Sequence, residues 1–271
     1  MTQQYLRPKR RFGQHFLEDP WVKKVVAAIA PKATDHILEI GPGRGALTFP
    51  LAAQAHKLLA IEIDRTLANA LNKPGNGTID IIQADFLELN LATIVKEIRG
   101  GYGLLRVVGN LPYNISAPII LRLLRHAHSN GITDATIMLQ REVGERVIAL
   151  PGSKNYGPLA VMATLHSDVK RLLNLPPGAF RPSPKVHSTL IQLQFHKPEF
   201  IPSSFKQFES FTRQLFTQRR KQVSNALNSV TFGSSFDSRD CCSRAKLDPS
   251  RRPAELTLAE LVELYEVVAL S

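Results

Sequence analysis

The chain alternates short apolar runs with segments of helical periodicity. Five apolar runs of strand length occupy residues 36–41, 57–64, 78–85, 104–110 and 135–140. Between them, hydrophobic residues recur at helical spacing over 46–55, 65–72, 90–98 and 116–127. This alternation is typical of βαβ units, in which helices cover both faces of a parallel sheet. We therefore expect an α/β fold with a Rossmann-like, mostly parallel sheet.

The flanking segments extend this pattern and then change its character. A helix is expected over 19–30, with Asp19 as its cap and Pro20 at its first position. Further helices are expected near 140–149 and 157–166, and the alternating run 187–195 predicts another strand. Beyond Pro198 the periodicity is helical over 203–217, 221–229 and 257–270, with 231–244 irregular. We therefore predict an α/β catalytic domain at 1–199 and a small helical domain at 200–271.

Charge adds a polyanion partner to this picture. The net charge is +11 and the pI about 9.9. Basic residues cluster in "RPKRRFG" (7–13), "RPSPK" (181–185) and "QRRK" (218–221). Such clusters on a globular chain point to nucleic acid first. No apolar run is long enough to span a bilayer, we read no secretory signal, and Cys241 and Cys242 match no zinc spacing. We expect a cytoplasmic protein with no membrane partner.

The segment "EIGPGRGALT" (39–48) places Gly41, Gly43 and Gly45 between the first strand of the sheet and a helix. Glycine there allows a tight turn and close approach of the backbone to a ligand. The GxGxG spacing departs from the GxGxxG fingerprint of dinucleotide-binding proteins, and no P-loop lysine is present. The loop therefore predicts a nucleoside-like ligand without a pyrophosphate cradle.

Two acids follow the next two strands. Glu62 ends the second strand, 21 residues after Gly41, where a carboxylate can accept both ribose hydroxyls of an adenosine. Asp85 follows the third strand and can accept a hydrogen bond from the adenine amino group. A ribose acceptor, an amine acceptor and a glycine loop of this kind fit S-adenosylmethionine better than a dinucleotide. Surface acids at strand ends are the alternative interpretation.

The fourth strand leads into "VVGNLPYNIS" (107–116) at the same edge of the sheet. The Asn110 side-chain carbonyl and the backbone carbonyl of Leu111 or Pro112 can accept hydrogen bonds from an exocyclic amine. Tyr113 can stack on a flat base, which contributes about 1–3 kcal/mol. Two acceptors would localise the amine's lone pair toward a methyl donor, so positioning and electrostatics suffice for methyl transfer without a strong base. An ordinary turn remains the alternative for this stretch taken alone.

These motifs resemble the ribosomal RNA adenine dimethyltransferase family, and within it the bacterial members that act on the small subunit. The resemblance rests on "FGQHFL" (12–17), "EIGPGRGALT" (39–48), "IEID" (61–64), "QADFLE" (83–88) and "GNLPYNIS" (109–116). It continues through "LQREVGER" (139–146), "YGPLAV" (156–161), "PPGAFRPSPKVHS" (176–188) and "FTQRRKQVSNAL" (216–227). It implies transfer of four methyl groups from S-adenosylmethionine to two adjacent adenosines near the 3′ end of 16S rRNA, without a metal.

The resemblance also assigns site residues in this sequence. It implies that the methyl donor is held by His15, Leu17, Gly41, Gly43, Glu62, Asp85 and Asn110. It implies an adenine pocket of Asn110, Leu111, Pro112 and Tyr113, with the ring of Phe180 on the second face of the base. The family usually has Asn where this chain has His15. Phe180 as a core residue and His15 as a surface residue are the alternatives.

A target base must leave its stack to enter such a pocket, which a loop with unpaired adenines favours. We expect the RNA backbone to be held by Arg10, Arg11, Arg181, Lys185, Arg219, Arg220 and Lys221, with salt-dependent affinity. We expect a monomer that participates in small-subunit biogenesis. Three alternatives remain open: a resistance-type large-subunit methyltransferase, a dinucleotide oxidoreductase, and a non-catalytic RNA-binding assembly factor.

Overall fold

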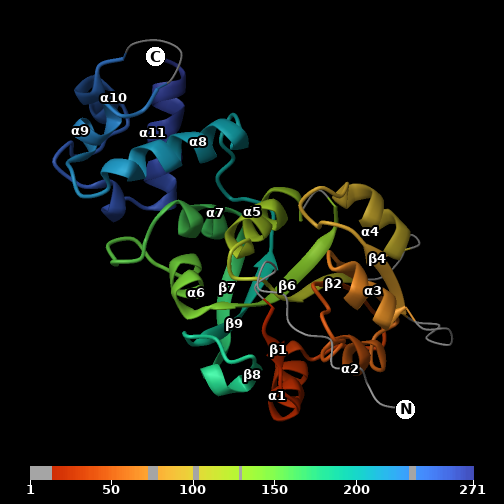
Figure 1. Ribbon diagram of the computed structural model, residues 1–271. Helices are drawn as coiled ribbons and strands as arrows, with labels where there is room; N and C mark the ends of the chain where they lie inside the picture. The colour runs from red at the N-terminus through yellow and green to blue at the C-terminus, as the bar shows by residue number, and fades with distance from the viewer. Residues whose placement is uncertain (1–13, 73–78, 100–103, 128–129, 232–235) are drawn as a thin grey trace. The chain divides into compact units, whose positions relative to one another are not determined.

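The computed structural model describes residues 14–72, 79–99, 104–127, 130–231 and 236–271, which form two compact units (Figure 1). The first unit comprises the described residues of 1–144 and 169–196. The second comprises those of 145–168 and 197–271. The chain therefore enters the second unit at 145–168, returns to the first, and leaves it near the boundary predicted at 199. The functional assignment of the two units stays a prediction.

A seven-stranded sheet forms the centre of the first unit. Its strands are β2 (Asp35–Ile40), β3 (Lys57–Glu62), β4 (Ile79–Gln83), β5 (Leu104–Asn110), β6 (Ile132–Gln140), β7 (Ser167–Leu175) and β9 (Ser188–Phe195). The spatial order is β4-β3-β2-β5-β6-β9-β7. The first five strands in this order are parallel, and β9 is antiparallel to β6. The Rossmann-like, mostly parallel sheet is therefore confirmed.

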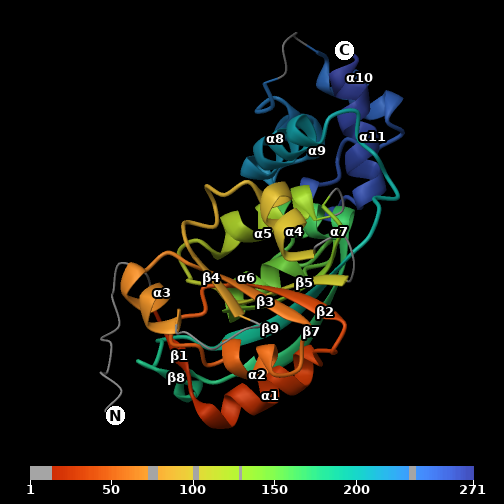
Figure 2. The ribbon, with the colours of Figure 1, turned by 90° about the vertical axis from the view of Figure 1, so that its right-hand side faces the viewer.

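Helices cover both faces of this sheet. They are α1 (Asp19–Ile29), α2 (Thr48–Ala52), α3 (Arg65–Leu71), α4 (Leu91–Arg99), α5 (Ser116–His126) and α6 (Arg141–Val147), the last reaching into the second unit. Figure 2 shows α1 and α2 on one face and α4 and α5 on the other. The apolar side of α1, with Val25 and Ile29, packs with Ile37 and Leu58 of the strands in one buried cluster. Burial on both faces explains why the strands read as nearly continuous apolar runs.

The order of the strands fixes where a ligand can bind. The chain moves outward from β2 to β3 and β4, then crosses back to β5 on the other side of β2. The loops after β2 and β5 therefore diverge and leave a crevice at the carboxyl ends of the strands. The loops after β3 and β4 reach the same edge because these strands are parallel to β2.

The second unit is helical. It contains α7 (Pro158–His166), α8 (Phe205–Leu215), η3 (Phe216–Gln218), α9 (Val223–Leu227), α10 (Ser238–Arg244), η4 (Pro253–Glu255) and α11 (Leu258–Ala269). Its core is aromatic: the ring of Tyr265 lies 5.5 Å from Phe208 and 5.7 Å from Phe211. The Tyr156 hydroxyl donates to the Leu256 carbonyl at 3.0 Å. This bond links 145–168 to the C-terminal part of the same unit.

Some predictions about elements were wrong. Segment 231–244 was expected to be irregular, yet Ser238–Arg244 is helical because the Asp237 carboxylate caps two amides at its N-terminus. Helix α1 begins at Asp19, so Glu18 is its N-cap residue and Asp19 is not. The edge strand β7 and the short pair β1 (Phe16–Leu17) and β8 (Phe180–Arg181) were not predicted. No helix of the described residues has the length and apolarity needed to cross a membrane.

Candidate functional site

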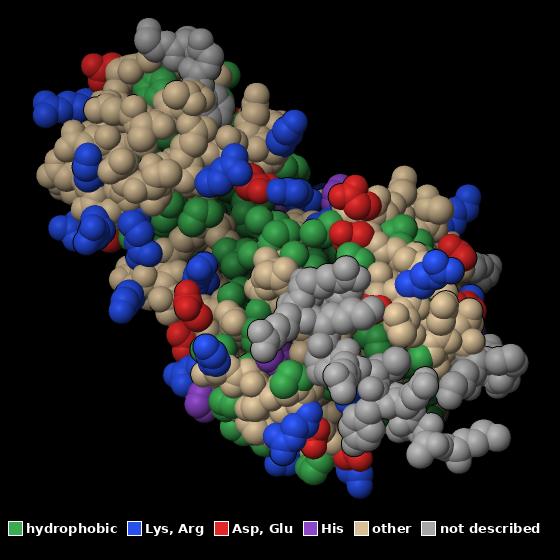
Figure 3. All heavy atoms as spheres, in the orientation of Figure 1, with side chains coloured by type: hydrophobic (Ala, Val, Ile, Leu, Met, Phe, Trp, Pro, Cys, Tyr) green, Lys and Arg blue, Asp and Glu red, His purple; other side chains and the backbone are tan. Residues whose placement is uncertain are grey.

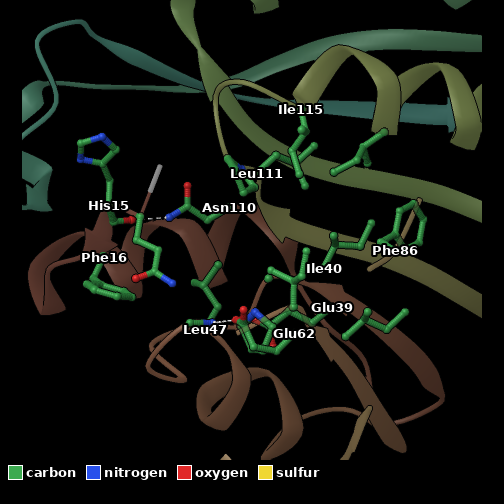
Figure 4. A pocket seen from close by; sticks show the side chains of 18 of the residues that line it. His15, Phe16, Glu39, Ile40, Leu47, Glu62, Phe86, Asn110, Leu111 and Ile115 are labelled. Carbon is green, nitrogen blue, oxygen red and sulfur yellow. Dashed lines mark hydrogen bonds between the residues drawn. The ribbon is translucent and has the colours of Figure 1, made fainter. Parts of the chain in front are cut away.

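A pocket lies at the carboxyl ends of the parallel strands, in the crevice between the loops after β2 and β5 (Figure 4). Its walls come from five segments: 14–17 around β1, 39–47 after β2, 61–63 after β3, 84–86 after β4, and 110–119 after β5. Four strand ends and the N-terminal segment therefore meet at one site, as the parallel sheet predicts.

The glycine loop forms the floor of this pocket. Gly41, Gly43 and Gly45 have φ angles of +71°, +61° and +85°, in a region that residues with side chains rarely adopt. A Cβ on Gly43 would also lie 3.1 Å from the ring of Phe16. The loop therefore needs glycine for its backbone conformation and, at Gly43, for the close approach of an aromatic ring.

Glu62 holds this loop in place. Its Oε2 accepts a hydrogen bond from the Gly43 amide at 3.0 Å, and its Oε1 accepts one from the Asp64 amide at 2.9 Å. The side chain is only 4 % exposed, and this burial raises the pKa of Glu62 although both amides favour the ionised form. A carboxylate offers about four acceptor positions, so two remain for a ligand in the pocket.

Asp85 is fixed by a short relay of hydrogen bonds. Its Oδ1 accepts from the Leu87 amide at 2.9 Å. The Leu87 carbonyl in turn accepts from Arg122 of α5 at 2.5 Å, and the same guanidinium also donates to the Leu89 carbonyl. Arg122 of α5 therefore holds the loop that carries Asp85 through hydrogen bonds to two of its backbone carbonyls.

Asn110 presents its side-chain oxygen to the pocket. Its Nδ2 donates to the His15 carbonyl at 2.8 Å, and since a carbonyl only accepts, the amide nitrogen must face His15. The opposite atom, Oδ1, accepts no hydrogen bond from any residue that the structure describes. This orientation leaves one fixed acceptor at the end of β5 (Figure 4).

Tyr113 and His15 form a stacked pair beside this acceptor. Their ring centroids are 5.2 Å apart and the planes 25° from parallel. The Tyr113 hydroxyl lies 2.8 Å from Ser188 Oγ, and burial raises the pKa of Tyr113, so the phenol is neutral. His15 Nδ1 lies 2.7 Å from the Pro182 carbonyl, which requires the proton on Nδ1. His15 thus contributes a backbone carbonyl to Asn110 and a ring to Tyr113.

The structure brings most of the predicted site residues into this one pocket. Its lining includes His15, Leu17, Gly41, Gly43, Glu62, Asp85, Asn110, Leu111, Pro112 and Tyr113. Phe180 is not part of the lining: it is 1 % exposed, pairs with Leu17 across β1 and β8, and packs in the core under α1. The expected stacking of Phe180 on a base would require exposing a ring that the structure buries.

The predicted RNA-binding residues occupy both units. Arg10 and Arg11 lie outside the described residues. Arg181 and Lys185 are exposed in the first unit, and Arg220 and Lys221 are exposed in the second. Arg219 is half-buried, and its guanidinium donates to the Lys154 carbonyl at 2.8 Å. Figure 3 shows Lys and Arg side chains distributed over the surface rather than gathered into one patch on the face it presents.

Sequence reasoning missed two residues of the site. Glu39 lines the pocket at 2 % exposure, and Arg122 reaches the Asp85 loop from α5. An acid inside the apolar run "HILEIG" was an available signal for Glu39. Nothing in the sequence marked Arg122. The described part of the chain holds no group of three or more His, Cys, Asp or Glu residues arranged to hold a metal ion.

Comparisons with known proteins agree with this geometry. The family described as "Ribosomal RNA adenine dimethylase" matches residues 6–268. "Ribosomal RNA small subunit methyltransferase A" of Legionella pneumophila (strain Corby) is 38% identical, with 97% of this chain and 98% of that protein covered. The protein of the same name from Xylella fastidiosa (strain Temecula1) is 40% identical, with 94% of each covered.

Two solved structures share the fold. A dimethyladenosine transferase from Plasmodium falciparum has a TM-score of 0.76 at 24% identity, with 92% of this chain and 96% of that chain covered. The 23S rRNA methyltransferase ErmE has a TM-score of 0.65 at 23% identity, with 93% and 98% covered. The predicted methyltransferase-type sheet with an added helical unit is therefore confirmed.

Proposed function

This chain belongs to the ribosomal RNA adenine dimethylase family, and we propose that it methylates adenosines of small-subunit ribosomal RNA with S-adenosylmethionine as donor. The target would be two adjacent adenosines in the 3′-terminal hairpin loop of 16S rRNA, each converted to N6,N6-dimethyladenosine. Support for the small subunit comes from the relatives of 38–40% identity, whose names specify it. Membership of the family excludes the dinucleotide oxidoreductase alternative.

The residues at the strand ends suit an adenosyl donor. The remaining acceptor positions of Glu62 would take the ribose hydroxyls, and the carboxylate of Asp85 would take the adenine amino group. The Gly43 amide is held by Glu62, and the absence of a side chain at this position lets the ring of Phe16 approach the loop. When bound, the donor supplies an electrophilic methyl group on a sulfonium. The protein's part is to fix its orientation and exclude water.

The observation that carries the proposal is the orientation of the Asn110 amide. With its nitrogen held by the His15 carbonyl, Oδ1 accepts a hydrogen bond from the N6 amino group, and a backbone carbonyl of Leu111 or Pro112 accepts a second. Two acceptors outside the ring plane oppose delocalisation of the amine's lone pair. The face of Tyr113 positions the base, and the proton leaves N6 after the methyl group has arrived.

RNA recognition would rest on the basic residues of both units. Arg181 and Lys185 belong to the unit that holds the pocket, and Arg220 and Lys221 to the helical unit. Phosphate contacts of this kind position a substrate and make its affinity depend on salt. We infer a monomeric, cytoplasmic enzyme that acts during small-subunit biogenesis. Phe180 would reach the second face of the base only by leaving the core.

A methylation assay tests the proposal. The protein would be incubated with labelled S-adenosylmethionine and undermethylated small or large ribosomal subunits, and the labelled bases mapped. We expect label on two adjacent adenosines of 16S rRNA. Label confined to large-subunit RNA would instead support the resistance-type alternative.

A matched pair of variants separates catalysis from RNA binding alone. Asn110→Ala removes the amine acceptor, and we expect transfer to fall by about 10²–10³-fold while RNA binding persists. Asn114→Ala removes an exposed amide four residues further on, outside the pocket, and should leave transfer unchanged. A wild-type rate of transfer by Asn110→Ala would refute the role of Asn110 as hydrogen-bond acceptor for the amino group. Absence of transfer by the wild type would favour the assembly-factor alternative.

A further inference from the structure

Glu39 is a buried acid that the proposed chemistry does not use. It lies on β2, one residue before the end of the strand, and its side chain is 2 % exposed. It lines the donor pocket beside Glu62 (Figure 4). Its Oε2 has no hydrogen-bond partner among the described residues. A carboxylate oxygen in this position is costly when ionised unless a positive charge faces it.

Of the two neighbouring acids, Glu39 is the one that takes up a proton. Both oxygens of Glu62 accept backbone amides, which stabilises its ionised form. Glu39 lacks such donors at Oε2. Burial is the main cause that raises the pKa of Glu39 to about 7; the Thr48 hydroxyl opposes this shift, and the negative charge of Glu62 adds a smaller upward contribution. The pair therefore shares one proton near neutral pH, held on Glu39.

The other charged or titratable groups of the pocket come from separate segments. His15 precedes β1, Arg44 follows β2, Asp85 follows β4 and Tyr113 follows β5. The Arg44 guanidinium lies over the ring of Phe16, 4.1 Å from its centroid. The neutral phenol of Tyr113 adds no charge.

We propose that Glu39 is the proton-linked counter-charge of the donor pocket: it holds a proton in the ligand-free protein and releases it when the cationic methyl donor binds. This inference rests on the proposed function. S-adenosylmethionine carries a sulfonium, an α-ammonium and a carboxylate, and so a net charge of +1. The demethylated product, S-adenosylhomocysteine, has no sulfonium and is neutral overall. A cation entering a buried site favours the ionised acid, so the donor displaces more of the proton than the product does.

The release of a proton from Glu39 predicts how strongly the affinity for the donor depends on pH. A group that loses a proton near pH 7 on binding makes the donor bind about tenfold more tightly at pH 8 than at pH 6. At pH 6.5, binding would release about three quarters of a proton from Glu39. The donor's own amino group, with a pKa of about 8, also titrates in this range. The Glu39→Gln variant removes the Glu39 contribution and leaves that of the amino group in place.

Calorimetry of the full-length protein tests the inference without any measurement of activity. Binding of S-adenosylmethionine and of S-adenosylhomocysteine is measured at pH 6.5 in two buffers of different ionisation enthalpy, which counts the protons released. We expect a larger release with the donor than with the product. In Glu39→Gln, the release should fall and the tenfold pH dependence should flatten. Glu97→Gln, an exposed acid of α4 outside the pocket, should behave as the wild type.

The outcomes separate this inference from the proposed function. If the donor binds but releases no proton, or releases as many protons as the product does, Glu39 is not its counter-charge. An unchanged pH dependence in Glu39→Gln leads to the same conclusion, and the proposed function then stands. If neither ligand binds the wild type, the proposed function fails and the inference fails with it.

Discussion

Gly109 lies on β5, beside β2 and directly before Asn110. Its neighbour across the parallel pair is Ile40. A Cβ at this position would lie 2.8 Å from the Ile40 carbonyl oxygen and 2.9 Å from Leu111 Cδ2. The carbonyl belongs to the backbone of a buried strand and cannot rotate away. We therefore predict that Gly109→Ala forces the two strands apart at the floor of the pocket.

The expected cost combines two terms. Overpacking of a buried site destabilises by about 1–3 kcal/mol. Replacing glycine by alanine also lowers the conformational entropy of the unfolded chain, which stabilises the folded state by about 0.4–1 kcal/mol. The net loss of unfolding free energy is then about 1–2 kcal/mol, which leaves the protein folded. Because the displacement begins beside Asn110, the rate of methyl transfer should fall by about 10–100-fold although the variant remains folded.

Urea denaturation and single-turnover transfer measure the two effects separately. The control is Gly178→Ala, an exposed position in the same unit where a Cβ would meet nothing within 4 Å. We expect that variant to stay within about 0.5 kcal/mol of wild type and to retain full transfer. If Gly109→Ala were as stable and as active as Gly178→Ala, the close contact with Ile40 would not be a constraint on the site.

Two further predictions concern ionisable groups of the pocket. Tyr113→Phe removes only the hydroxyl near Ser188 Oγ and should change KM for RNA by less than about tenfold in steady-state kinetics. Tyr113→Ala also removes the stacking surface, which contributes about 1–3 kcal/mol, and should raise KM by roughly 10–100-fold. Equal effects of the two substitutions would contradict a role for the ring. Between pH 4.5 and about 7, Glu39 carries a proton in the folded protein but not in the unfolded chain. The free energy of unfolding of the wild type should therefore fall by about 2–3 kcal/mol from pH 5 to pH 8, whereas that of Glu39→Gln should not. Urea titrations of both proteins at the two pH values measure this, and a difference between them that does not vary with pH would contradict it.

The sequence by itself determined the sheet and the position of the site. Alternating apolar strands and amphipathic helices require helices on both faces of a parallel sheet, and parallel strands end at one edge. Glu62, Asp85 and Asn110 each follow such a strand, so their convergence could be deduced from chain order alone. The positive φ of Gly41 and Gly43 follows equally from local chemistry, because a tight loop between strand and helix favours glycine.

Only the tertiary structure decided which groups are buried, paired or turned toward the ligand. On sequence alone, Phe180 was assigned to the base pocket and Glu39 had no role, yet Phe180 packs into the core and Glu39 borders the pocket. The direction of the Asn110 amide depends on the His15 carbonyl, 95 residues away, and the Asp85 loop depends on Arg122. The hydrogen bonds from Asn110 to His15 and from Arg122 to Leu87 join residues that are distant along the chain. Periodicity and spacing carry no information about such neighbours.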